Sequence, residues 1–147
     1  MLNVKVTGAR EAQADLREIQ AVLSDSDYMW DAIIDRLLIE EIKDVFESEA
    51  DGKWPPRLDN KPHPLLRKSL ALYKSLTVRG APGHVDIRTQ DTLEYGTDIS
   101  YAIFHEEGTA RIPARPFLET VVQRGNFEQR LEELIERILE DRIEKVS

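Results

Sequence analysis

DYMWDAIIDRLLIEEIKDVFESE, the stretch from Asp27 to Glu49, carries the longest strong pattern in this chain. Apolar side chains recur there at every fourth position, and a second apolar set widens the stripe. The first set is Trp30, Ile34, Leu38, Ile42 and Phe46, and the second is Met29, Ile33, Leu37 and Val45. This spacing predicts an amphipathic helix with one broad buried face. We expect it to be the main core helix and to end at Asp51-Gly52.

Alternating apolar and polar residues predict a small sheet around this helix. Leu2 to Val6 alternates, and so does the stretch from His84 to Thr89, in which Val85 and Ile87 are the apolar positions. Such alternation is typical of half-buried strands. Leu93 to Thr97 follows after a short polar turn and is expected to pair with the preceding strand as a hairpin.

Four further segments have helical patterns. They are Ala9–Leu23, Leu65–Leu76, Ile99–Glu107 and a C-terminal helix over about residues 126–145. Asp98 is a candidate cap for the third. Thr77 to Arg79 reads as the start of a strand, and residues 120–123 are ambiguous between helix and extended chain.

Residues 52–64 hold four of the seven prolines, so this segment is predicted to be a loop. The expected fold class is α+β, with the small antiparallel sheet packed against the long core helix and with further N- and C-terminal helices. Nothing divides residues 1–147, so one domain is expected. The pattern leaves open whether the C-terminal helix folds back or reaches a neighbouring subunit.

The composition limits the possible functions. The chain has 147 residues, no cysteine and a net charge of −8, so neither a disulfide nor a cysteine metal site is possible. Broad nucleic-acid binding is disfavoured because it requires a surplus of Lys and Arg. No apolar run approaches the roughly 18 residues of a membrane span. The first residues lack the apolar core of a signal peptide, and we therefore expect synthesis in the cytoplasm and no membrane contact.

A search for chemistry finds no convincing active site. His105-Glu106 resembles the start of a zinc-protease motif, but Thr109 stands where the second histidine ligand should be. Asp86, Glu94 and Asp98 could together bind a metal ion in a small nuclease, although no lysine or other base stands at a recognisable spacing. The sequence therefore predicts no catalytic residue, no cofactor and no metal.

The segment YAIFHEEGTARIPARPFL, residues Tyr101 to Leu118, has the character of a recognition element. Pro113 and Pro116 stiffen it before it meets a partner, which lowers the entropic cost of an interface. Arg115 is suited to a bidentate bond with a neighbour's carboxylate or to a salt bridge that locks the loop. For Phe117 the sequence leaves two locations open, the chain's own core and an interface with a partner.

His105 lies four residues after Tyr101 and is therefore on the same helical face. We expect a packed histidine with a hydrogen-bonded nitrogen rather than a metal ligand.

This segment resembles the signature of tailed-bacteriophage virion morphogenesis proteins, the tail-completion, tail-terminator and neck group. The shared features are Tyr-Ala, an acidic Gly-Thr, and then Pro-Ala-Arg-Pro-Phe-Leu. A Trp-Pro-Pro loop at Trp54, followed by Leu65-Leu66, resembles a second motif of the family. Arg67-Lys68-Ser69 departs from the family pattern, in which a small residue and a glycine are common. The two motifs span about half of the chain.

The resemblance implies a structural virion protein, not an enzyme. Such proteins form rings, commonly of six copies, at the end of the tail tube or in the neck, where they dock the head. The implied partners are other copies of the chain, the tail tube and the head-completion proteins, with DNA only as passing cargo. The implied location is the virion, assembled in the cytoplasm of the bacterial host. The assembly candidates are Trp54, Tyr101, His105, Arg111, Arg115, Phe117 and Leu118.

Two other functions are kept as alternatives. A non-viral interaction module could use the acidic helices to bind a partner, and the metal-dependent nuclease described above is the weaker option. If the ring reading holds, we expect acidic side chains to line or flank the lumen and to keep DNA from adhering, since the net charge is −8.

Overall fold

The computed structural model describes residues 2–6, 27–57, 65–66, 70–89 and 92–146. Three strands form one antiparallel sheet: β1 (Leu2–Val6), β2 (His84–Arg88) and β3 (Leu93–Thr97). The order is β1-β3-β2, so the N-terminal strand lies at one edge. Gly96 of β3 faces Asn3, and a β-carbon at Gly96 would collide with the main chain of β1. These strands confirm the two predicted from alternation and the hairpin partner predicted at Leu93–Thr97.

The long helix predicted from the opening stretch is confirmed. It runs as α2 (Asp27–Ile33), a π-helical turn η1 (Ile34–Leu38) and α3 (Ile39–Ser48). The π turn was not predicted, and such turns insert one extra residue into the helical repeat. The helix ends where the backbone turns left-handed, first at Glu49, with φ 53°, and then through Gly52, with φ 81°.

Three short helices and one long helix complete the described structure. The short ones are α4 (Ala71–Thr77), α5 (Ala102–Glu107) and α6 (Leu118–Gln123), and the long one is α7 (Phe127–Val146). The helix predicted over Leu65–Leu76 begins late, because Leu66 and Leu70 have φ values of 59° and 62° and cannot lie in a right-handed helix. The strand predicted from Thr77 is wrong, since Thr77 is the last residue of α4 and a turn follows.

The helix predicted to start at Ile99 begins at Ala102, and Asp98 does not cap it. Tyr101 occupies the cap position without a side-chain bond. The main-chain N–H of Asp98 donates to Gly83 O at 2.9 Å. The ambiguous residues 120–123 belong to α6. The predicted helix Ala9–Leu23 lies outside the described residues.

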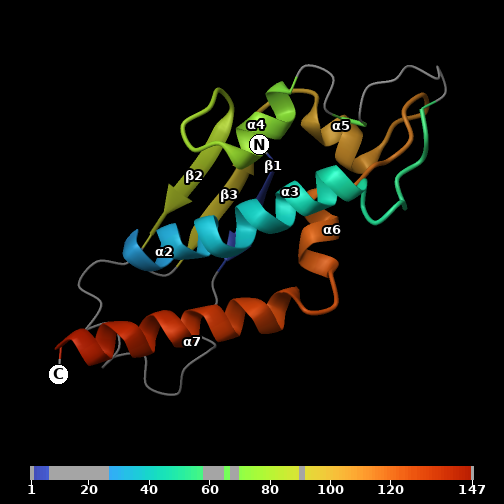
Figure 1. Cartoon of the computed structure of the whole chain (residues 1–147). Coiled ribbons are helices and arrows are strands. Elements are labelled where there is room, and N and C mark those ends of the chain that lie inside the picture. The colour runs from blue at the N-terminus through green and yellow to red at the C-terminus, as the bar shows by residue number, and fades with distance from the viewer. Residues whose placement is uncertain (1, 7–26, 58–64, 67–69, 90–91, 147) are drawn as a thin grey trace.

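The long helix crosses one face of the sheet, and α7 runs beside it (Figure 1). The core lies between these layers. Tyr95 and Leu93 enter it from the sheet, Trp30 and Phe46 from the long helix, and Ile135 from α7. The C-terminal helix therefore folds back on its own chain, which resolves the alternative that the sequence left open. The α+β class is confirmed.

Candidate assembly surface

The two motifs that carry the family resemblance meet in space. The indole Nε1 of Trp54 donates to Pro116 O at 2.8 Å. In return, the Arg115 guanidinium donates through Nε to Pro55 O at 2.8 Å and through Nη2 to Pro56 O at 3.0 Å. Three hydrogen bonds thus join two segments about sixty positions apart in sequence. We call this pair of segments, residues 54–56 and 113–118, the proline clasp.

Arg115 acts inside the clasp. It is 9% exposed, and burial lowers the pKa of its guanidinium, with the charge of Arg57 adding to the effect. Its partners are main-chain carbonyls, where the sequence had suggested a carboxylate. Arg115 locks the loop as one of the two predicted roles requires, but by hydrogen bonds to carbonyl oxygens instead of a salt bridge.

The apolar residues of the clasp belong to the chain's own core. Phe117 is 1% exposed, and its ring lies 5.6 Å from that of Phe46, centroid to centroid. Trp54 meets the same ring edge-on at 5.5 Å. Leu118 is also buried. The structure thus places Trp54, Phe117 and Leu118 inside the fold, and none of them presents a free anchor.

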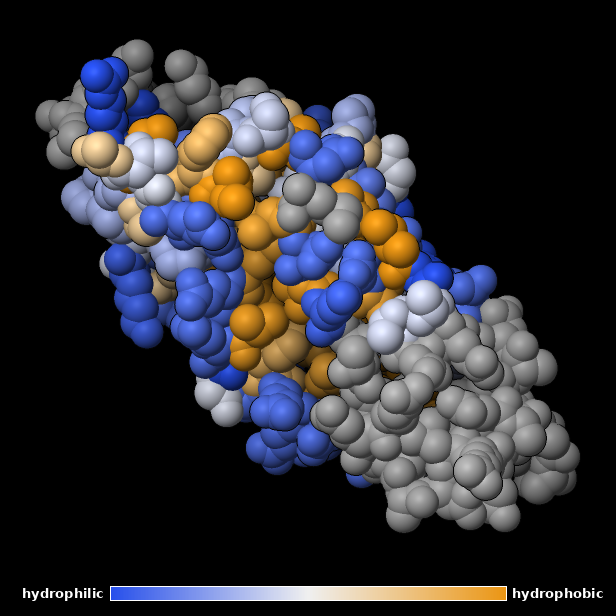
Figure 2. Space-filling model, turned by 180° about the vertical axis from the view of Figure 1, so that it is seen from behind, coloured by the Kyte–Doolittle hydropathy of each residue, from blue (hydrophilic) through white to orange (hydrophobic). Residues whose placement is uncertain are grey.

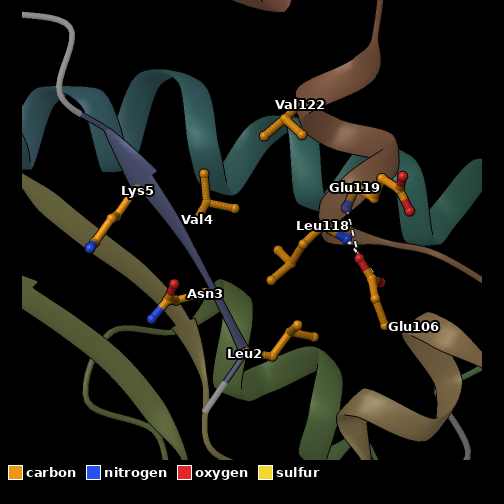
Figure 3. A pocket seen from close by; sticks show the side chains of 8 residues that line it. All are labelled: Leu2, Asn3, Val4, Lys5, Glu106, Leu118, Glu119 and Val122. Atoms are coloured by element: carbon orange, nitrogen blue, oxygen red, sulfur yellow. Dashed lines mark hydrogen bonds between the residues drawn. The ribbon is translucent and has the colours of Figure 1, made fainter.

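Glu106 holds the far end of the clasp, and sequence reasoning missed it. Its Oε2 accepts the N–H group of Phe117 at 2.6 Å. Oε2 also accepts the N–H of Leu118 at 3.3 Å, and Oε1 accepts that of Glu119 at 2.8 Å (Figure 3). The carboxylate therefore satisfies the orphan donors at the start of α6. Burial raises the pKa of Glu106, while these three donors act in the opposite direction. The signal was Ala102, four residues earlier, which marks that face of α5 as buried.

His105 packs against Tyr101, as predicted. The rings meet edge-on with centroids 5.8 Å apart. The Nδ1 atom is buried and has no hydrogen-bond partner among the described residues, so the expected bond to a histidine nitrogen is not found there. His105 O accepts the N–H of Arg115 at 2.8 Å. Burial lowers the pKa of His105, and the nearby charge of Arg115 lowers it further.

The outer side of α5 is unusually apolar for an exposed surface. Tyr101 is 38% exposed, Ile103 43% and Phe104 51%. Arg111 is exposed as well, in a turn where Thr109 Oγ1 accepts its N–H at 3.2 Å. Of the seven residues predicted for assembly, only Tyr101 and Arg111 are exposed, and Phe104 was not among them.

A groove of about 460 Å³ lies between the edge strand β1 and α6. Its lining consists of Leu2, Asn3, Val4, Lys5, Glu106, Leu118, Glu119 and Val122 (Figure 3). On the face that carries β1, apolar residues form a hollowed band bordered by hydrophilic ones (Figure 2). We call this feature the β1–α6 groove.

A buried acid on α3 holds the wall of this groove in place. Glu41 is 6% exposed and pairs with Arg124, at 3.0 Å, and with Arg130. Arg124 also contacts Asp44 at 2.6 Å. These pairs tie the connection between α6 and α7 to α3. Sequence reasoning did not find them, because the partners lie eighty or more residues apart.

Two of the three residues considered for a nuclease, Asp86 and Glu94, are engaged in ion pairs. Both carboxylate oxygens of Asp86 accept from Arg88, each at 2.8 Å, and Glu94 pairs with Lys5 at 3.2 Å. Across the described residues, no group of three or more His, Cys, Asp or Glu side chains could hold a metal ion. Within the same part of the chain, no helix is both long enough and apolar enough to cross a membrane.

Comparisons with family models, curated proteins and solved structures gave no match to this chain.

Proposed function

We propose that this chain is a structural virion protein of a tailed phage or prophage, which forms a ring that completes or terminates the tail and helps to join it to the head or neck. The observation that carries this proposal is the proline clasp. The Trp54 motif and the Pro113–Leu118 motif were recognised separately in the sequence, and the bonds from Trp54 to Pro116 and from Arg115 to Pro55 make them one unit.

A locked clasp suits a protein that acts by assembly. Its prolines and buried anchors fix the position of the neighbouring α5 before any partner arrives, and preorganisation lowers the cost of association. The exposed Tyr101 and Phe104 are then held on a stiff support. The partners under this proposal are other copies of the chain, in a ring of six, together with the tail tube and the neck or head-completion proteins. The proposal requires no cofactor.

The outer side of α7 supports a role beside passing DNA. Its exposed acidic residues are Glu128, Glu132, Glu133, Glu136, Glu140 and Asp141. A wall of this charge would repel phosphates and keep DNA from adhering while it moves through a ring. A basic inner wall in an assembled ring would contradict this part of the proposal.

The test is to delete the coding sequence from the phage or prophage that carries it and to examine the particles by electron microscopy. We expect heads and tails that fail to join, or tails of unregulated length. Adding the purified full-length chain to such an extract should restore joined, infectious particles, and the chain alone at high concentration should form closed rings. Normal infectious particles without the chain would refute the proposal.

A further inference from the structure

The molecule has two different apolar surfaces, which face in different directions. One is the exposed side of α5, which we call the α5 ridge and define as Tyr101 and Phe104. The other is the β1–α6 groove. Scattered exposed apolar residues are ordinary, but two exposed aromatic side chains so close in sequence, at Tyr101 just before α5 and at Phe104 within it, indicate a contact site.

The ridge and the groove lie on opposite sides of the same helix. Glu106 lines the groove, and Phe104 precedes it by two residues. Each residue of an α-helix turns the side chain by about 100°, so these two side chains point about 200° apart. A surface that faces away from the groove cannot fill the groove of its own molecule. It can reach the groove of a neighbouring copy.

The shape and the polarity of the groove match such an occupant. Leu2, Val4 and Val122 give it apolar walls that can cover aromatic rings, each of which buries about 150–250 Å². β1 is an edge strand, and in an antiparallel pair alternate residues turn their main-chain polar groups away from the partner. The main-chain polar groups of Asn3 and Lys5 are therefore available to bond the tyrosine hydroxyl.

The charges beside the two surfaces are complementary. The ridge is followed by Glu107 and then by Arg111, both exposed. The groove has an exposed Glu119 on the α6 wall, while Lys5 on the β1 wall is exposed and pairs with Glu94 at 3.2 Å. The exposed Arg111 can therefore pair with Glu119 of the next copy, which favours a single orientation of approach.

From these observations we infer that the α5 ridge of one copy enters the β1–α6 groove of the next copy. The contact is head-to-tail, since it joins different patches on identical molecules. Contacts of this kind produce a ring when the rotation closes. The inference rests on the proposed function for the ring, while the contact itself concerns only two copies of this chain.

Because the chain has no cysteine, engineered cysteines can test the contact cleanly. Phe104→Cys and Val122→Cys each place one thiol at an exposed position of the full-length chain, one on the ridge and one in the groove. Treated with a short bismaleimide, each variant alone should remain essentially uncross-linked. An equal mixture of the two should give a cross-linked dimer, at least about tenfold more than either alone. A chain carrying both changes should give a ladder of larger species.

Ile87→Cys is the matched control, because Ile87 on β2 is 48% exposed, close to the 51% of Phe104, and lies outside both surfaces. Its mixture with Val122→Cys should give no dimer above the level of the single variants. Strong cross-linking of either single variant with itself would indicate a twofold contact and overturn the inference. Absence of the dimer in the mixture would overturn it as well.

The outcomes separate this inference from the proposed function. Closed rings or restored particles without the 104–122 cross-link would refute the contact and leave the virion role standing. The cross-link in a protein that joins no tail would establish the contact and remove the virion role.

Discussion

A single buried carboxylate, that of Glu106, satisfies three main-chain donors at the start of α6. Glu106→Ala would leave these donors without their acceptor, and we expect the free energy of unfolding to fall by about 1–3 kcal/mol. Glu107→Ala is the matched control, since Glu107 is exposed, and should change it by no more than about 0.5 kcal/mol. Urea denaturation measures both. Equal losses for the two variants would show that the capping bonds contribute nothing.

His105 should make stability depend on pH. Its pKa is lowered in the folded chain below the ordinary value of 6.5, so the unfolded chain binds the proton more readily. The free energy of unfolding should therefore be highest above pH 6.5 and should fall as the pH drops towards the lowered pKa. His105→Gln removes this titration. Denaturation at a series of pH values gives the free energy of unfolding of both proteins. The difference between the wild type and His105→Gln should shrink as the pH falls, and a difference that stays constant would show that His105 does not cause the pH dependence.

Individual residues of the clasp show how far sequence reasoning reaches. The prolines and Arg115 marked a specialised segment in the sequence, and in the structure Arg115 donates hydrogen bonds to Pro55 O and Pro56 O. Whether Phe117 faced inwards could not be known, because the answer depends on Trp54 and Phe46, which are distant in sequence. Local pattern identifies an unusual residue, whereas its burial is a property of the tertiary fold.

Between elements, the Glu41 cluster fastens the α6–α7 connection to α3. Glu41→Gln would leave Arg124 and Arg130 without this buried carboxylate, and we expect a loss of about 1–3 kcal/mol. Hydrogen exchange followed by mass spectrometry should show faster exchange along α7, with β2 and β3 less affected. Glu40→Gln, at an exposed position, is the control. Exchange that speeds up equally in all elements would argue against a local clamp.

The predicted elements agree with the structure where one periodicity dominates. The long helix and the hairpin of β2 and β3 were found because their patterns run without interruption. The start of α4 was missed because Leu70 adopts a left-handed conformation that an apolar sequence pattern does not announce. The groove could not be predicted from the sequence. It forms between β1 and α6, and the positions of these two elements relative to each other depend on the tertiary packing of the core.

For the whole molecule, the folded-back α7 narrows the choice of assembly surfaces. Its apolar stripe, which includes Leu134, Ile135 and Ile138, is buried against the long helix. That stripe is therefore not available to a neighbouring copy. Among the described residues, the α5 ridge carries exposed aromatic side chains close in sequence to the buried clasp. Our proposal therefore assigns stability and assembly to different aromatic residues.

This division predicts opposite behaviour for two phenylalanines. Phe117→Ala removes a ring that is 1% exposed and should cost about 3–5 kcal/mol, so assembly would fail because the fold is weakened. Phe104→Ala removes a ring that is 51% exposed and should change stability by no more than about 0.5 kcal/mol. If the ridge is an interface anchor, this second change should still weaken self-association by about 2 kcal/mol, or roughly thirtyfold. Thermal unfolding and sedimentation velocity measure the two properties separately, with Ile87→Ala as the exposed control. A Phe104→Ala chain that associates like the wild type would refute the role of the ridge.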